Sequence, residues 1–454
     1  MSLFDLAQAA AAIGAEARGE ATVERVCSDS RGVVPGDLFV ALRGDKYDGH
    51  AFVVAAFEKG AAAALVERAA VPRHGWGDKP LLVVDDTRQA LSRLAAWWRQ
   101  TLATPLAAVT GSNGKTTVKE MLAAILRAHA GDAAVLATQG NLNNDVGVPL
   151  TLLALRPGHR YGVIEMGMNH AGEIAALSAI ARPDVALVNN AQAAHLFGLG
   201  SVEAVARAKG EIFQGLGAQG VAVINADDPH APLWRALAAP RRTLSFGLQN
   251  PADVRASVQL EALASELAVE TPDGGFHARL AVPGLHNARN ALAATAAALA
   301  LGVAPPAIAR GLAAFAGVKG RLQRKHAVHG GVLLDDTYNA NPGSLAAALD
   351  VLAAQPGRRV LVLGDMGELG AEAAALHAEM GRAARAAGVE RLIALGEASV
   401  HAARAFGTGG QHCETIEDLL HEAENVLAPG VTLLVKGSRF MRMERVIAGL
   451  EEKN

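Results

Sequence analysis

The chain has 454 residues, which exceeds the size of one compact core and predicts about three domains. Its net charge is −3, which does not favour a nucleic-acid partner, and no apolar run reaches the ~18–20 residues of a membrane-spanning helix. No basic segment precedes the first apolar residues, and Cys27 and Cys413 lack metal-ligand spacing. We therefore expect a cytoplasmic α/β protein with plain thiols, no secretory signal and no membrane insertion.

Residues 1–103 are predicted to form a smaller N-terminal α/β domain. Turn residues alternate there with short apolar strands, and a strand at 81–84 precedes a helix at 86–103. The loops carry Ser30, Arg31, Asp48 and His50, whose side chains suit a polar, phosphate-bearing ligand. Such residues are also ordinary in turns, and the pattern alone leaves both interpretations open.

Residues 104–318 are predicted to form a central domain that begins with a phosphate-binding loop. The apolar run 106–109 ends at Thr110-Gly111-Ser112-Asn113-Gly114, and a helical pattern starts at Lys115. A strand, a glycine-containing loop and a helix N-terminus in this order hold polyphosphate through backbone N–H groups. Lys115 is expected to reach the terminal phosphates, and the Thr116 hydroxyl to bind Mg²⁺. The general motif has glycine where this chain has Val109, so the loop is a variant.

Apolar strands alternate with helical segments after this loop. Strands that are apolar throughout indicate a parallel sheet covered on both faces, whose carboxyl ends bind ligands. A small β insertion is predicted at about 241–284, followed by an alanine-rich helix at 286–301. The strands lie at 135–138, 162–166, 185–189 and 221–225, and the polar residues at their ends are Glu165, Asn189, Asn190 and Asn225.

Glu165, His195 and Lys209 are the candidate catalytic and metal-binding residues of this domain. Glu165 ends a buried strand, where a carboxylate near a phosphate loop favours Mg²⁺. His195 follows the next strand and suits either a metal ligand or an ordinary loop histidine. Lys209 falls on the apolar face of a helical pattern that starts at Val202. An ammonium there is costly unless it is paired, chemically altered or extended towards solvent.

Residues 319–454 are predicted to form a C-terminal Rossmann-like domain. Strands at 332–336, 359–364, 391–396 and 431–436 are separated by helix-length segments, which is typical of a doubly wound sheet. Polar loops follow the first and the last of these strands, at 335–342 and 436–439. Each loop is equally typical of a ligand site and of a solvated turn.

The motifs of the chain resemble those of the Mur ligase family. The loop at 110–117 is similar to the family's ATP loop, which also lacks the early glycine. Phe197 departs from the family, which often has glutamate at that position. Further matches follow in order along nearly the whole chain: Ser28-Asp-Ser-Arg31, Asp48-Gly-His-Ala-Phe52, Gln139-Gly-Asn-Leu-Asn-Asn144, Glu165-Met-Gly-Met-Asn-His170, Ala208-Lys-Gly-Glu-Ile212, His286-Asn-Ala-Arg-Asn290, Gly320-Arg321, Tyr338-Asn-Ala-Asn-Pro342, Leu363-Gly-Asp-Met-Gly-Glu-Leu-Gly370 and Val435-Lys-Gly-Ser-Arg439.

The resemblance implies a domain that binds a UDP substrate, a central ATPase domain and a C-terminal domain that closes over the site. It implies ATP and Mg²⁺ as cofactors, and a Lys209 carbamylated by CO₂ that binds a second Mg²⁺. The implied catalytic residues are Lys115, Lys209 and His195, and the implied metal ligands are Thr116, Glu165, His195 and Lys209. The UDP substrate is expected at Ser30, Arg31, Asp48 and His50. ATP is expected at Thr110, Gly111, Ser112, Asn113, Gly114, Lys115, Thr116, Thr117, Asn287, Asn290, Arg321, Asp336, Tyr338 and Asn339.

The resemblance also implies the reaction, an ATP-dependent amide ligation in cytoplasmic peptidoglycan precursor synthesis. The expected partners are UDP-N-acetylmuramoyl-tripeptide and D-alanyl-D-alanine, joined through an acyl phosphate, and the expected assembly is a monomer. A folylpolyglutamate synthase is one rival, but it would begin near the phosphate loop without the preceding 103 residues. A nucleotide-switched binding protein is another, but the chain has no guanine-specific Asn-Lys-x-Asp segment.

Overall fold

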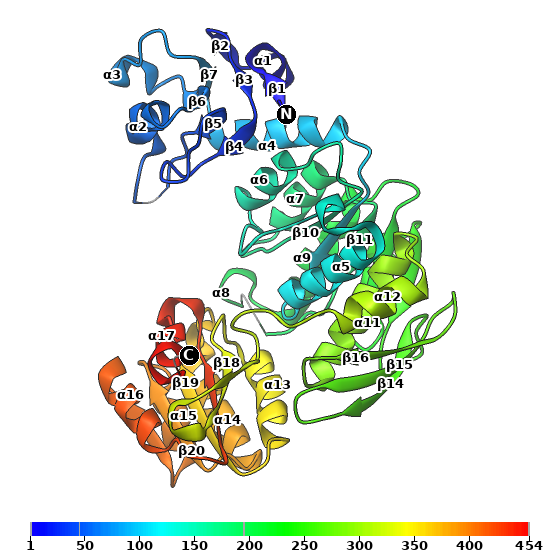
Figure 1. Ribbon diagram of the computed structural model, residues 1–454, viewed down its shortest axis with the longest axis vertical. Coiled ribbons are helices and arrows are strands. Elements are labelled where there is room, and N and C mark those ends of the chain that lie inside the picture. The colour runs from blue at the N-terminus through cyan, green and yellow to red at the C-terminus, as the bar shows by residue number, and fades with distance from the viewer. Residues whose placement is uncertain (1, 45, 194–195, 453–454) are drawn as a thin grey trace.

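The computed structural model describes residues 2–44, 46–193 and 196–452. Three lobes follow one another along the chain, from the blue N-terminal lobe through the cyan and green centre to the yellow and red C-terminal lobe (Figure 1). Each lobe contains one larger sheet, which confirms an α/β fold of three domains. None of the described helices combines the length and the hydropathy that a bilayer crossing requires.

The N-terminal lobe contains a five-stranded sheet in which one edge strand is antiparallel and the other strands are parallel. Helix α4 (Thr87–Gln100) leads out of this lobe, and Asp86 caps it by accepting two backbone N–H groups. Trp98 and Arg99 of α4 donate to backbone carbonyls of the central lobe, at 3.1 and 3.0 Å. The remaining elements are β1 (Phe4–Asp5), α1 (Leu6–Ile13), β2 (Glu16–Arg18), β3 (Thr22–Val23), β4 (Arg25–Cys27), β5 (Asp37–Val40), α2 (Val53–Glu58), β6 (Ala63–Glu67), α3 (Val71–His74) and β7 (Leu81–Val84).

The central lobe contains a parallel six-stranded sheet in the order β13-β12-β11-β8-β10-β9. Separate apolar cores cover its two faces, which is why its inner strands are mainly apolar up to their carboxyl ends. The strands are β8 (Leu106–Thr110), β9 (Val135–Ala137), β10 (Tyr161–Glu165), β11 (Val185–Val188), β12 (Val221–Asn225) and β13 (Arg242–Phe246). The helices are α5 (Lys115–Ala130), α6 (Gly147–Leu153), α7 (Glu173–Ala181), α8 (Leu196–Leu199), α9 (Val202–Gly210), α10 (Ala231–Ala238), α11 (Leu285–Ala300) and α12 (Pro305–Ala313).

The predicted β insertion was wrong at its N-terminal end. Residues 242–246 form β13, which pairs in parallel with β12 and extends the central sheet. The insertion itself is a separate antiparallel sheet of β14 (Arg255–Leu260), β15 (Ser265–Glu270) and β16 (Phe276–Leu280). Strand β13 begins with two exposed residues, so the apolar pattern of the inner strands is missing there.

The C-terminal lobe contains a six-stranded sheet in the order β17-β18-β22-β19-β20-β21. Only β17 (Gln323–His326) is antiparallel to its neighbour, and its four polar residues gave no strand signal in the sequence. The other strands are β18 (Val332–Asp336), β19 (Arg358–Gly364), β20 (Arg391–Leu395), β21 (Gly410–Cys413) and β22 (Val431–Lys436). The helices are α13 (Pro342–Ala353), α14 (Ala373–Ala386), α15 (Val400–Phe406), α16 (Ile416–Asn425) and α17 (Glu444–Leu450).

Candidate active site

The register of the central sheet brings the predicted site residues together. Strand β8 lies between β10 and β11, with Glu165 opposite Val109 and Val188 opposite Thr110. One edge of the sheet therefore carries the phosphate loop, the Glu165 carboxylate and the polar residues that follow β11. This edge is the carboxyl end of the strands, where open α/β sheets bind ligands.

The phosphate loop is held by amide side chains that follow β11. The Asn113 N–H donates to Asn190 Oδ1 at 2.9 Å, and Asn189 and Asn190 both donate to the Asn113 carbonyl. Gly114 has φ +81° and packs directly against Asn189 and Asn290, so a Cβ at this position would collide with both amides. The loop therefore needs glycine at 114 both for its left-handed backbone and for the lack of space.

Lys115 lies over this loop and shares its surroundings with other charged groups. Its Nζ donates to the Gly111 carbonyl at 2.6 Å and to the Ser112 carbonyl at 3.2 Å. Burial lowers the pKa of Lys115, and the positive charge of Arg321 lowers it further, whereas Glu165 opposes both effects. Lys115 is therefore close enough to Glu165 and Arg321 for their charges to interact.

Glu165 has the properties expected of a Mg²⁺ ligand. The residue is 2% exposed, and Asn143 Nδ2 donates to its Oε1 at 2.8 Å. Its Oε2 is buried and has no hydrogen-bond partner among the described residues. The described residues contain no cluster of three or more His, Cys, Asp or Glu that could hold a metal.

Lys209 is buried in helix α9, on the apolar face that the sequence predicted. It is 1% exposed, which excludes the alternative of an ammonium extended towards solvent. Burial lowers the pKa of Lys209 well below its usual value, and the nearby charge of Lys115 lowers it further. Lys209 therefore belongs to the same group of residues as Lys115 and Glu165. His195, the other predicted catalytic residue, lies outside the described residues.

The C-terminal lobe reaches the phosphate loop through Arg321 and Asn341. Arg321 Nη2 donates to the Thr116 hydroxyl at 2.8 Å, and its guanidinium lies 4.4 Å from the ring centroid of Tyr338. Asn341 and Asn113 exchange two side-chain hydrogen bonds, of 2.8 and 3.2 Å. Residues of two lobes, far apart in sequence, therefore meet at the loop.

Other predicted ATP residues have partners within the protein. Asn290 Oδ1 accepts from Asn189 at 3.0 Å, and Asn287 Nδ2 donates to the Pro283 carbonyl at 2.8 Å. Asp336 pairs with Lys436 at 2.5 Å, and Lys436 also donates to the Asn339 carbonyl. The contacts of these residues with ATP stay predictions.

Sequence reasoning missed several residues that support the site. Asn189 and Asn190 were noted at strand ends but given no role, and Gln192 was not considered. Gln192 Oε1 accepts from Asn113 Nδ2 at 2.5 Å. The only available signal was their position just after a buried strand, because amides are common in loops for many other reasons.

The predicted UDP-substrate residues have internal partners. His50 is 1% exposed; one ring nitrogen accepts the Glu67 N–H at 2.9 Å, and the other pairs with Asp48 at 2.5 Å. Arg31 is exposed and pairs with Asp29 at 2.7 Å, and Lys59 donates to the Ser30 carbonyl. His50 therefore has a clear role in holding its loop, and the UDP-binding roles stay predictions.

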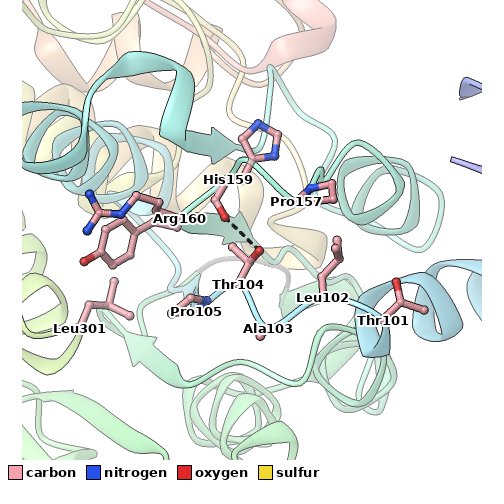
Figure 2. Close-up of a pocket in the computed structure, with 10 residues that line it drawn as sticks. Thr101, Leu102, Ala103, Thr104, Pro105, Pro157, His159, Arg160 and Leu301 are labelled. Carbon is pink, nitrogen blue, oxygen red and sulfur yellow. Dashed lines mark hydrogen bonds between the residues drawn. The ribbon is translucent and has the colours of Figure 1, made fainter. Parts of the chain in front are cut away.

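A concavity of about 600 Å³ lies at the opposite edge of the central sheet (Figure 2). The Thr104 hydroxyl donates to the His159 carbonyl there, at 3.1 Å. The lining residues include Pro105 and Tyr161, which stand at the amino ends of β8 and β10. This concavity is therefore separate from the phosphate loop.

Comparisons with known proteins match most of the chain to one family. The family model described as the Mur ligase family catalytic domain matches residues 22–99. The Mur ligase middle domain matches residues 109–298, and the Mur ligase glutamate ligase domain matches residues 320–439.

Relatives and solved structures give the same result. The UDP-N-acetylmuramoyl-tripeptide–D-alanyl-D-alanine ligase of Escherichia coli is 45% identical over 95% of this chain and 94% of its own. A crystal structure of MurF from Acinetobacter baumannii is 38% identical, covers 98% of both chains and has a TM-score of 0.91. The MurF ligase of Thermotoga maritima, solved with ADP, is 29% identical over 94% of this chain and 96% of its own, with a TM-score of 0.81. The chain belongs to the Mur ligase family and is an ATP-dependent ligase.

Proposed function

We propose that the chain joins UDP-N-acetylmuramoyl-tripeptide to D-alanyl-D-alanine in the cytoplasm, as a step of peptidoglycan precursor synthesis. One observation carries the proposal: Lys115, at the phosphate loop, is close enough for its charge to interact with both the Glu165 carboxylate and the buried Lys209. The similarity to ligases named for these two substrates, over 95% of the chain, supports the same reaction.

The reaction has two steps. The terminal carboxylate of the tripeptide attacks the γ-phosphorus of ATP, which gives an acyl phosphate and releases ADP. The amine of D-alanyl-D-alanine then attacks the acyl carbon; phosphate leaves, and the amine loses a proton.

The protein contributes mainly position and charge to the first step. The backbone N–H groups at the start of α5 bind the phosphates, and Lys115 moves from the loop carbonyls to the transferring group. Arg321 brings a second cation from the C-terminal lobe. Mg²⁺, when bound at Glu165 and Thr116, offsets charge on the phosphates.

Lys209 is suited to carbamylation because its depressed pKa keeps the amine neutral over a wider pH range. The neutral nitrogen attacks the carbon of CO₂ and loses a proton, which yields an anionic carbamate. The carbamate then places a negative charge near the Lys115 ammonium, where a second ammonium would be unfavourable, and supplies oxygen ligands for a metal. Incubation with ¹³C-labelled bicarbonate should give a new carbonyl resonance that is absent from Lys209→Arg; an unchanged spectrum contradicts the carbamate.

The test of the function is phosphate release from ATP in the presence of UDP-N-acetylmuramoyl-tripeptide, with and without D-alanyl-D-alanine. We expect sustained release only with the dipeptide, together with a product whose mass equals both substrates less one water. Phosphate release that does not depend on the dipeptide, or release without that product, overturns the proposal.

We also propose that the enzyme acts as a monomer, since one chain supplies all the named site residues. Light scattering during turnover tests this point, and a dimer mass would contradict it.

A further inference from the structure

The two carboxylate oxygens of Glu165 have different surroundings. Oε1 accepts a hydrogen bond from Asn143 Nδ2 at 2.8 Å. Oε2 is buried and has no partner among the described residues. Because the residue is only 2% exposed, bulk water does not make the two oxygens equivalent. One oxygen is therefore committed to the protein, and the other remains for a ligand.

Asn143 is itself held firmly in place. The Gly167 N–H donates to the Asn143 carbonyl at 2.8 Å, and the Asn143 N–H donates to the Asn141 carbonyl at the same distance. A Cβ at Gly167 would lie 3.1 Å from the amide carbon and oxygen of Asn143, so glycine leaves room for this side chain. The segment after β10 therefore fixes the amide that binds the carboxylate of β10.

The backbone of Glu165 is fixed from the other side. Its N–H donates to the Thr138 hydroxyl at 3.0 Å. The Thr138 carbonyl accepts from Lys119 Nζ at 2.7 Å, and Lys119 is 1% exposed on α5, the helix of the phosphate loop. Glu165 is thus held at its main chain and at one oxygen, which limits how its carboxylate can turn towards a cation.

We propose that Asn143 makes the site selective for Mg²⁺ over Ca²⁺ by holding Glu165 in one-oxygen coordination. Ca²⁺ takes about 6–8 oxygens and often binds both oxygens of a carboxylate, whereas Mg²⁺ requires a compact octahedron. With Oε1 engaged by Asn143, the bidentate mode of Ca²⁺ is blocked, and the single-oxygen mode of Mg²⁺ is left intact. Asn143 is a positioning residue, and the inference rests on the proposed function only in placing a divalent cation at Glu165.

The experiment measures metal binding rather than activity, on the full chain without nucleotide. Mn²⁺ is titrated and followed by electron paramagnetic resonance, and Mg²⁺ or Ca²⁺ alone is then added to displace it. The quantity compared is the ratio of the Ca²⁺ to the Mg²⁺ dissociation constant. Removing a hydrogen bond to a metal ligand changes metal affinity by about 10–100-fold. We expect the ratio to fall about tenfold in Asn143→Ala.

Two further variants make the result specific. Asn143→Leu keeps about the size of the side chain but removes the donor and adds no oxygen ligand, so the ratio should fall there as well, while circular dichroism stays native. Leu142→Ala changes a half-exposed neighbour in the same loop and should leave the ratio unchanged. An unchanged ratio in both Asn143 variants overturns the inference.

Glu165→Gln separates this inference from the proposed function. Loss of Mn²⁺ binding in that variant supports a cation at Glu165, on which the selectivity argument depends. Mn²⁺ binding that is unaffected by Glu165→Gln overturns the metal role of Glu165, and the selectivity argument with it. Mn²⁺ binding that requires Glu165, together with a Ca²⁺-to-Mg²⁺ ratio that is unchanged in both Asn143 variants, overturns the selectivity argument alone.

Discussion

The central and the C-terminal sheets both have charged residues at the carboxyl ends of their strands, but the partners of these charges differ between the two sheets. At the C-terminal sheet the charges have protein partners: Lys436 pairs with Asp336, and Asp365 accepts the N–H groups of Ala398 and Ser399. At the central sheet, the buried Lys209 lies near a second lysine, Lys115, and Glu165 has an oxygen without a partner among the described residues.

The difference indicates which edge performs the chemistry. A buried charge that is paired within the protein is costly to disturb and acts as part of the scaffold. A buried charge left for a ligand has a perturbed pKa and marks a functional site. We therefore expect the reaction to take place at the carboxyl end of the central sheet. The carboxyl end of the C-terminal sheet positions the side chains that this lobe contributes to the site.

The strongest test of this comparison is the removal of the Lys115 ammonium. In Lys115→Ala we expect kcat to fall by about 10³-fold or more, because no other described cation lies over the phosphate loop carbonyls. Binding of the UDP substrate should change little, since its predicted residues lie in another lobe. Phosphate release measures the first effect and calorimetry the second. Ligase activity within tenfold of the unaltered enzyme would falsify the role of the loop.

At the C-terminal sheet, where the charges are paired, we expect a substitution to lower the stability of the protein and not only its activity. Lys436→Met leaves Asp336 buried without its cation, which should lower the free energy of unfolding by about 3–5 kcal/mol. Urea denaturation followed by circular dichroism measures this change. The double variant Lys436→Met/Asp336→Leu should recover most of the loss, and equal destabilisation of both proteins would contradict the pairing argument.

The stability of the protein should depend on pH through His286, which lies where the central and the C-terminal lobes meet. Burial lowers the pKa of His286 to about 4, and Lys436 and Arg289 add to this effect while Asp336 opposes it. Between the unfolded pKa of 6.5 and the folded value of about 4, the unfolded chain binds more protons, so stability falls as pH falls. Because the pKa falls from 6.5 to about 4, the full contribution is about 3 kcal/mol.

His286→Gln provides the comparison for this pH effect. The urea midpoint of the unaltered protein should fall more steeply between pH 6.5 and 4 than that of the variant. Parallel curves for the two proteins would show that His286 does not titrate in this way. Both proteins carry the same other carboxylates, so their contribution cancels in the difference.

The smallest expected effect concerns Arg321, the cation of the C-terminal lobe that contacts the central lobe. Arg321→Lys keeps the charge but loses the stacking on Tyr338 and the fork that reaches Thr116. We expect the affinity for ADP to fall about tenfold, or about 1.4 kcal/mol. Arg324→Lys is the matched control, since Arg324 is exposed on β17. Equal ADP affinity in both variants would remove Arg321 from the nucleotide site.

Much of the fold could be predicted from the sequence because its signals are local. The inner strands of both large sheets are mainly apolar, and the order of strand, loop and helix around Lys115 is visible within a few residues. Strands β13 and β17 escaped prediction because edge strands carry polar residues, and pairing with a neighbour is what makes them strands.

The sequence by itself determined the three α/β units, the phosphate loop and the apolar helix face on which Lys209 lies. Only the tertiary structure decided that the charge of Lys115 acts on the buried Lys209, that one oxygen of Glu165 is engaged by Asn143, and that Asn341 meets Asn113. The physical reason is the range of the interactions. Apolar periodicity acts within a single element, whereas the pKa of a buried amine and the pairing of two amides depend on residues that folding alone brings into contact.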